Sequence, residues 1–154
     1  MPSWNTVPSY AGLLKPGTEM ALSAQDALIS LMIVAAWSDA AMTDEELQRI
    51  AILVGEAPVF AGFEQSRLPT IANTCVDKIN GPAGLDGVLD EAVAALPKRL
   101  EDTAYALCVE VAAVDLQLEQ EELRLLEMIR DRLTLDRLTT AAIEVGARAR
   151  YRKA

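Results

Sequence analysis

The spacing of apolar residues predicts helices along most of the chain after its first 20 residues. A helix is predicted from Ser23 to about Ser38, and apolar residues occupy all of its faces. A second one of this kind is predicted from Pro97 to about Val114. Because a helix that is apolar on every side offers no face to water, both should be central and buried. Amphipathic helices are predicted at about 43–55, 63–80, 83–96, 119–133 and from 136 toward the end. The predicted apolar stripe of the helix at 119–133 includes Leu123, Leu126, Met128, Ile129 and Leu133.

Capping residues set several of the predicted helix ends. Ser23, Thr43 and Asp136 each stand at the first position of a predicted helix, where a side-chain oxygen can accept from a free backbone N–H. Thr43 and Glu46 also have the spacing of a capping box. Gly55 is expected near the end of the second helix. With no convincing strand, the predicted fold is all-α, with about seven helices packed as one bundle.

The chain contains an internal repeat with a shift of 76 positions, the distance from Asp39 to Asp115. Over the 22 positions from Asp26 to Leu47, seven residues have an identical counterpart in the second half. These seven are Asp26, Leu31, Ala36, Asp39, Glu45, Glu46 and Leu47. The acids carry most weight, because their spacing is kept through a turn. We therefore expect two pseudo-duplicated helix–turn–helix halves.

The repeated turns are candidates for a cation site. In each half an Asp ends a buried helix and a Glu opens the next, so the two carboxylates can face each other across the turn. If the halves pack with pseudo-twofold symmetry, four carboxylates can converge: Asp39, Glu46, Asp115 and Glu122. Carboxylates without histidine or thiol ligands suit Ca²⁺, Mg²⁺ or Mn²⁺.

Two other interpretations of the turns stay open. Acids in a first helical turn also stabilise the positive end of the helix dipole, by about 0.3–1 kcal/mol each, so capping alone explains each turn taken singly. Capping explains the recurring Asp less well, since the dipole disfavours a carboxylate near a helix C-terminus. A catalytic carboxylate pair is the third interpretation. No phosphate loop or nucleophile elbow accompanies it, so we expect no enzyme, no catalytic residue and no other cofactor.

The amino-acid composition excludes several classes of site and makes some partners less plausible than others. The 154 residues suffice for one domain with a core, and the absence of histidine excludes His-based triads and most zinc sites. The net charge of −9 makes nucleic acid a poor partner and a basic protein surface a plausible one. Cys75 and Cys108 lie in apolar helical sequence and are expected to be small buried hydrophobes.

The two ends of the chain have their own character. Residues 1–20 are rich in Pro, Gly, Ser and Thr and are expected to form an extended or loosely docked arm, followed by a helical domain over 21–154. No signal peptide or membrane span is evident, which favours the cytoplasm. The tail from Ala147 carries four of the chain's bases. It is interpreted as a helix end, with a weak anchor to anionic lipid or to an acidic partner as the alternative.

The sequence resembles the TerB family of tellurite-resistance proteins. The resemblance rests on "AAWSDAAMTDEE" and "VAAVDLQLEQEE", which follow the family pattern of an Ala-rich helix leading into an Asp and, seven residues on, a Glu. It covers roughly residues 20–150. It implies a helical domain of pseudo-duplicated halves, an acidic metal site at Asp39, Glu46, Asp115 and Glu122, and cytoplasmic or membrane-associated stress complexes.

This sequence departs from the family pattern after the Asp in each turn, and the second turn also has Glu119 where the family prefers Ser or Thr. The glycine that follows the Asp in the family is replaced by Ala40 and Leu116. Glycine there would permit a positive φ and a close approach of the backbone to a ligand. We expect a non-enzymatic stress-response protein with a protein partner, cytoplasmic or peripheral to the inner membrane, and no small-molecule substrate. A metal-free interaction module with an acidic surface is the alternative.

Overall fold

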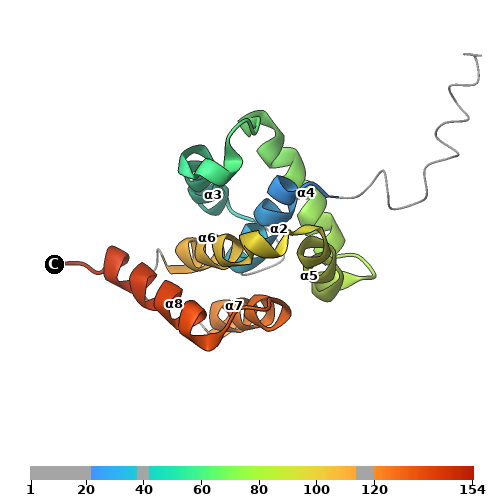
Figure 1. The fold of residues 1–154 in the computed structure, drawn as a ribbon. Helices are drawn as coiled ribbons and strands as arrows, with labels where there is room; N and C mark the ends of the chain where they lie inside the picture. Colours follow the sequence, from blue (N-terminus) through green and yellow to red (C-terminus); the bar gives the residue numbers. More distant parts are fainter. Residues whose placement is uncertain (1–21, 38–41, 114–119) are drawn as a thin grey trace, which may run out of the picture.

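Seven α-helices and no strand make up the part of the chain that the computed structural model describes, residues 22–37, 42–113 and 120–154 (Figure 1). The predicted all-α class is therefore confirmed. The expected N-terminal arm lies outside the described residues. The helices are α2 (Ala24–Ala36), α3 (Asp44–Glu56), α4 (Leu68–Ile79), α5 (Gly84–Ala95), α6 (Glu101–Ala113), α7 (Gln120–Arg132) and α8 (Arg137–Tyr151).

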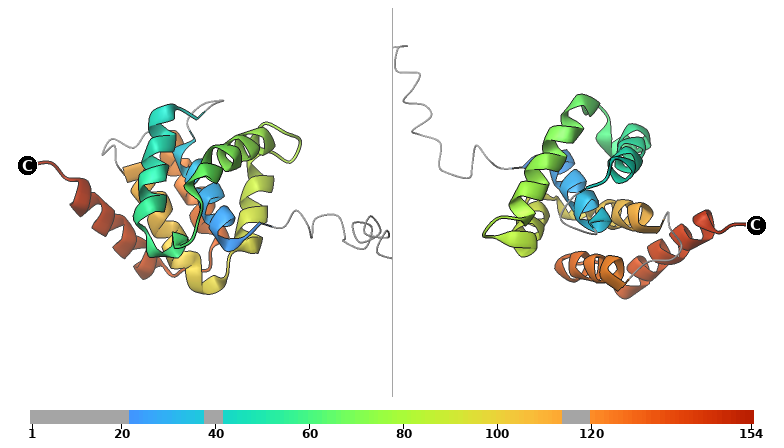
Figure 2. Two further views of the ribbon diagram at one scale, coloured as in Figure 1. Left: turned by 90° about the horizontal axis from the view of Figure 1, so that it is seen from above. Right: turned by 180° about the vertical axis from the view of Figure 1, so that it is seen from behind.

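Helices α2 and α6 form the centre of the bundle, as their all-round apolar sequence predicts. Every residue of α2 from Ala27 to Ala36 is buried, and α6 buries its residues on most sides. The two helices pack against each other, and α2 also contacts α3, α4, α5 and α7 (Figures 1 and 2). Burial of these two helices supplies much of the hydrophobic stabilisation.

The first and last residues of the helices follow the same internal repeat as the sequence. A shift of 76 positions carries α3 onto the bounds of α7 and carries α2 to within one residue of α6. The packing is reciprocal as well, because α2 contacts α7 and α6 contacts α3. Helix α4 packs on α2 as α8 packs on α6, and α5 is an additional helix between the halves. These relations are the ones that a pseudo-twofold axis between the halves requires.

The predicted caps are present. Ser23 Oγ accepts from the backbone N–H of Asp26, Thr43 Oγ1 from that of Glu46, and Asp136 Oδ1 from that of Thr139. The helix expected from about residue 63 starts later. A short 3₁₀ turn at Gln65–Arg67 precedes α4, and Pro69 lies in the first turn of α4, where its missing N–H leaves no intrahelical bond unmade.

The apolar stripe of α7 differs from the predicted one at its start. Leu123 was expected on the inner face but is 44% exposed, whereas Leu125 and Leu126 are buried. The buried positions continue through Ile129 and Leu133, so the inner face follows a spacing of four residues from Leu125. Leu123 precedes Leu125 by two residues, which is a rotation of about 200° around the helix, so its side chain lies outside the buried arc.

Candidate functional site

The acidic turns are only partly visible in the described residues. Glu46 lies in the first turn of α3, its backbone N–H is capped by Thr43 at 3.2 Å, and its Oε2 is buried. Asp39 and Asp115 lie outside the described residues. Glu122 lies in α7, but its side chain is also outside them. The predicted convergence of the four carboxylates is thus left as a prediction.

No three Asp, Glu, Cys or His side chains gather at metal-ligand distance among the residues whose side chains the structure describes. That set contains one of the four predicted ligands, Glu46. What the structure adds is the frame around the turns. Both turns follow a buried helix of the central pair, α2 or α6, and both lead into an equivalent amphipathic helix, α3 or α7.

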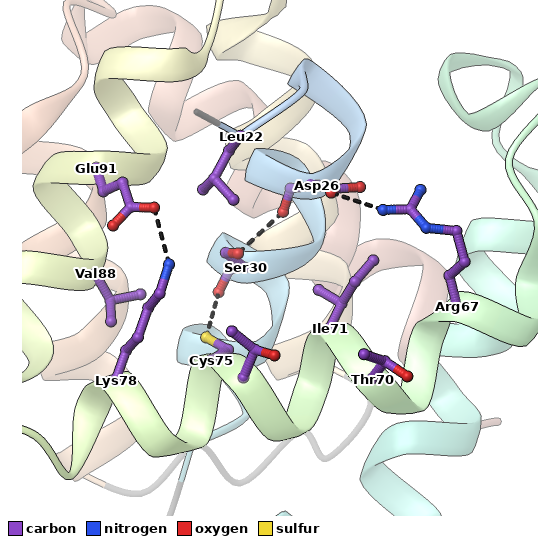
Figure 3. Close-up of a pocket in the computed structure, with 11 residues that line it drawn as sticks. Leu22, Asp26, Ser30, Arg67, Thr70, Ile71, Cys75, Lys78, Val88 and Glu91 are labelled. Carbon is purple, nitrogen blue, oxygen red and sulfur yellow. Dashed lines mark hydrogen bonds and ion pairs between the residues drawn. The ribbon is translucent and has the colours of Figure 1, made fainter. Parts of the chain in front are cut away.

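A cavity that the sequence did not predict lies between α2, α4 and α5 (Figure 3). Its volume is about 220 Å³, and Leu22, Ile71 and Val88 give it apolar walls. Its polar lining consists of the ion pairs Asp26–Arg67 and Lys78–Glu91 together with Ser30, Thr70, Thr74 and Cys75. A mainly apolar hollow with a few convergent polar groups is the usual form of a small-molecule site.

The two ion pairs stand on opposite sides of this cavity. Arg67 Nη2 lies 2.9 Å from Oδ2 of Asp26, and Lys78 Nζ lies 2.9 Å from Oε1 of Glu91. Arg67 is also held over the ring of Phe63, 5.3 Å from its centroid. Lys78 and Glu91 line a second hollow as well, next to the Gly81–Pro82 turn, so this ion pair separates the two spaces.

The side of the cavity formed by Ser30 and Cys75 carries no charge. The hydroxyl of Ser30 donates to the backbone carbonyl of Asp26 at 2.9 Å, within α2, and the Cys75 thiol lies 3.9 Å from the carbonyl of Ser30. Burial raises the pKa of the Cys75 thiol to about 11, and the nearby Lys78 ammonium offsets this only in part. The thiol is therefore protonated at neutral pH and is a poor nucleophile.

Asp26 is the polar residue of the cavity whose bonding is incomplete. Its side chain is 16% exposed, its Oδ2 is paired with Arg67, and its Oδ1 is buried without a hydrogen-bond partner among the described residues. A buried acceptor left unmet costs about 1–3 kcal/mol. The carboxylate also lies in the first turn of α2, where the helix dipole stabilises negative charge.

One indirect signal for this cavity was present in the internal repeat. Asp26 belongs to the repeat, and its counterpart is Asp102, but the base that pairs with Asp26 comes from a 3₁₀ turn 41 residues later. The place equivalent to the cavity, between α6 and α8, is a more open hollow lined by Asp102, Ala106 and Leu138. There Asp102 is exposed and its Oδ1 accepts from the N–H of Thr103.

Comparisons of the chain with protein-family models, with curated proteins and with solved structures find no match. None of the helices in the described part of the chain is both long enough and apolar enough to cross a bilayer.

Proposed function

We propose that the chain is a TerB-like, non-enzymatic stress-response module that binds a divalent cation through its two acidic turns. The observation that supports this most directly is the equivalence of the two helix–turn–helix units. The shift of 76 positions that aligns Asp39 with Asp115 and Glu46 with Glu122 in the sequence also carries the bounds of α3 onto those of α7. The units also pack reciprocally, because α3 and α7 each contact the central helix of the other half.

The chemistry of such a site follows from its charges. Four carboxylates held close together would repel one another, and a cation of charge +2 with a preference for oxygen would relieve the repulsion. The buried Oε2 of Glu46 supports an inward orientation of this ligand at the start of α3. In this proposal Asp39 and Asp115 are ligands from the ends of the central helices, and Glu46 and Glu122 complete the set.

Calorimetric titration of chelator-treated protein with Ca²⁺, Mg²⁺ and Mn²⁺ tests the proposal. Saturable binding of at least one cation is expected, and Glu46→Gln should weaken it by at least tenfold. The matched control is Glu45→Gln, the exposed neighbour one position earlier on α3. Absence of binding to the wild type up to millimolar cation would contradict the proposal, as would equal losses in the two variants.

The exposed face of α3 favours a second candidate function, a metal-free interaction module. Ile52 is 56% exposed, and Glu45 and Glu56, one or two turns away on the same face, are exposed acids. An apolar centre with acidic flanks suits an amphipathic partner helix with basic flanks. On this proposal Ile52→Ser weakens binding of a labelled Leu/Lys amphipathic peptide, measured by fluorescence anisotropy, whereas Val145→Ser on α8 leaves it unchanged. Equal binding by both variants would contradict it.

A further inference from the structure

We propose that the exposed face of α3 binds the outer face of α8 of a second copy of this chain. The inference rests on the metal-free interaction module and deepens it, because it names the helix that the α3 face takes as its partner. Three observations carry it: the opposite charges of the two faces, the exposed apolar residues at their centres, and the matched spacing of their charged residues. Both helices lie at the periphery of the bundle (Figure 1).

The outer face of α8 is apolar although it is exposed. Leu138 is 81% exposed and Val145 is 60% exposed, and three alanines of the same helix are exposed as well: Ala141, Ala142 and Ala149. These positions recur every three or four residues, so they form one stripe, on the side of α8 opposite to its contact with α6. We call these five residues the α8 stripe.

The charges beside the α8 stripe are basic. Arg137 and Arg148 are exposed, and neither is in an ion pair with another described residue. The one acid within α8, Glu144, accepts hydrogen bonds from Tyr105 and Arg130 and is thus used inside the bundle. An apolar stripe with basic edges is the arrangement that suits the acidic face of α3.

Helix α3 presents the opposite charge around its own apolar centre. Ile52 is 56% exposed, and the exposed Glu45 and Glu56 are in no ion pair with a described residue. Asp44 is a third exposed acid, and the only base of α3, Arg49, is half-buried. Because exposed ion pairs contribute little to affinity, the apolar contact supplies most of the binding, and the charges select the partner and its orientation.

The charged residues of the two faces are equally spaced. Glu45 and Glu56 are 11 positions apart on α3, and Arg137 and Arg148 are 11 positions apart on α8. Eleven residues make about three helical turns with a rise of about 16 Å, so each pair lies along one edge of its helix. When the two helices lie side by side, both glutamates can therefore meet an arginine while Ile52 contacts the α8 stripe.

The contact joins two different faces, so it is head-to-tail and builds short chains of copies unless a rotation closes a ring. One helix pair buries less than the roughly 800 Å² per partner of a stable interface, and each copy carries a net charge of −9, so association should be weak. We expect a Kd between about 10 μM and 1 mM at 0.15 M salt. At lower protein concentration the α3 face is free, so the peptide titration described above is not affected.

Sedimentation equilibrium of the full chain tests this inference. At 0.15 M salt the mean mass of the wild type should rise as the concentration rises from about 10 μM to 1 mM. Ile52→Lys, which puts a base on the α3 face, should stay monomeric, and so should the double variant Leu138→Ser with Val145→Ser. An equimolar mixture of the two should form a 1:1 complex, because one keeps its α8 stripe and the other its α3 face. Circular dichroism checks that each variant is folded.

The charged edges are tested in the same way. Glu45→Lys with Glu56→Lys should weaken self-association at least tenfold, and so should Arg137→Glu with Arg148→Glu. A mixture of these two double variants should associate again, because each acidic edge then faces a basic one. Leu123→Ser, at an exposed apolar position of α7, should associate like the wild type.

Three results would overturn the inference. The first is a wild type that stays monomeric at about 1 mM. The second is a mixture of Ile52→Lys with the α8 double variant that forms no complex. The third is self-association of Ile52→Lys alone, which would show a contact between two α8 helices instead. Peptide binding by a wild type that does not self-associate would overturn this inference alone and leave the interaction module standing.

Discussion

The hydroxyl of Tyr105 donates a hydrogen bond of 2.6 Å to Oε1 of Glu144. The same oxygen accepts from Nη1 of Arg130 at 3.1 Å. Tyr105 lies in the central helix α6, Arg130 in α7 and Glu144 in α8, so a single carboxylate oxygen ties the three helices of the second half together. Tyr105 is fully buried, which makes its hydroxyl dependent on this acceptor.

Removal of this hydroxyl should destabilise the protein measurably. Tyr105→Phe deletes a partly buried hydrogen bond to a charged group, and such a bond typically contributes about 1.5–3 kcal/mol. Tyr151→Phe is the matched control, because Tyr151 donates to Glu110 at 2.7 Å but is only partly buried at the end of α8. Urea denaturation followed by circular dichroism should show the larger loss for Tyr105→Phe. A loss as large for Tyr151→Phe would contradict this ranking.

Among the described carboxylates that accept hydrogen bonds, Glu101 should be the one whose replacement lowers the stability of the protein most. It is buried at the start of α6, and its Oε1 accepts from both the backbone N–H and the hydroxyl of Thr134, each at 2.7 Å. Glu101→Ala removes two hydrogen bonds to a buried charged group and should lower the free energy of unfolding by about 2–3 kcal/mol. Glu91→Ala, which removes a half-exposed ion pair with Lys78, should lower it by less than about 1 kcal/mol. Similar losses in denaturant melts would count against this assignment.

Much of the fold was predictable because its signals are local. The all-round apolar sequence of α2 and α6 specified their central position, and the side chains of Ser23, Thr43 and Asp136 specified three helix starts. The repeat, which extends to the helix bounds, was visible in the spacing of its acids. In these cases the cause and the structure lie within a few residues of each other in sequence.

The cavity depends on contacts that no local pattern encodes. Asp26 meets Arg67 across 41 positions, and Arg67 reaches it from a 3₁₀ turn that the periodicity did not indicate. Leu123 was placed inside for a similar reason, since only the packing of α7 on its neighbours decides which of several leucines face inward. The acidic turns remain a prediction from spacing, because Asp39 and Asp115 lie outside the described residues.

Buried thiols should make the protein sensitive to alkaline pH. The pKa of Cys75 rises from its ordinary value near 9.0 to about 11 on folding, because burial disfavours the thiolate. The contribution of this thiol to stability is fully present below pH 9 and is lost as the pH rises through 11, about 2.7 kcal/mol in all. Cys75→Ala should therefore reduce the fall in unfolding free energy between pH 9 and 11. Burial also raises the pKa of Cys108 and Tyr105, so part of the fall should remain.

The control for this pH dependence is Asp136→Asn. Hydrogen bonds from Thr139 lower the pKa of Asp136, so this carboxylate changes the stability of the protein only at acid pH. The slope above pH 9 should be the same in this variant as in the wild type. An unchanged alkaline slope in Cys75→Ala would show that the thiol is accessible to water in the native state.

The melting temperature of chelator-treated protein, with and without millimolar Ca²⁺, Mg²⁺ or Mn²⁺, tests the proposed cation site most directly. A cation at a hundredfold excess over its Kd stabilises the native state by about 2.7 kcal/mol, enough to raise the melting temperature by several degrees. The double variant Asp39→Asn with Asp115→Asn should lose this rise and, without cation, should melt higher than the wild type because repulsion is reduced. A wild-type melting temperature that stays the same with all three cations would contradict the proposal and leave the acids of both turns as helix caps.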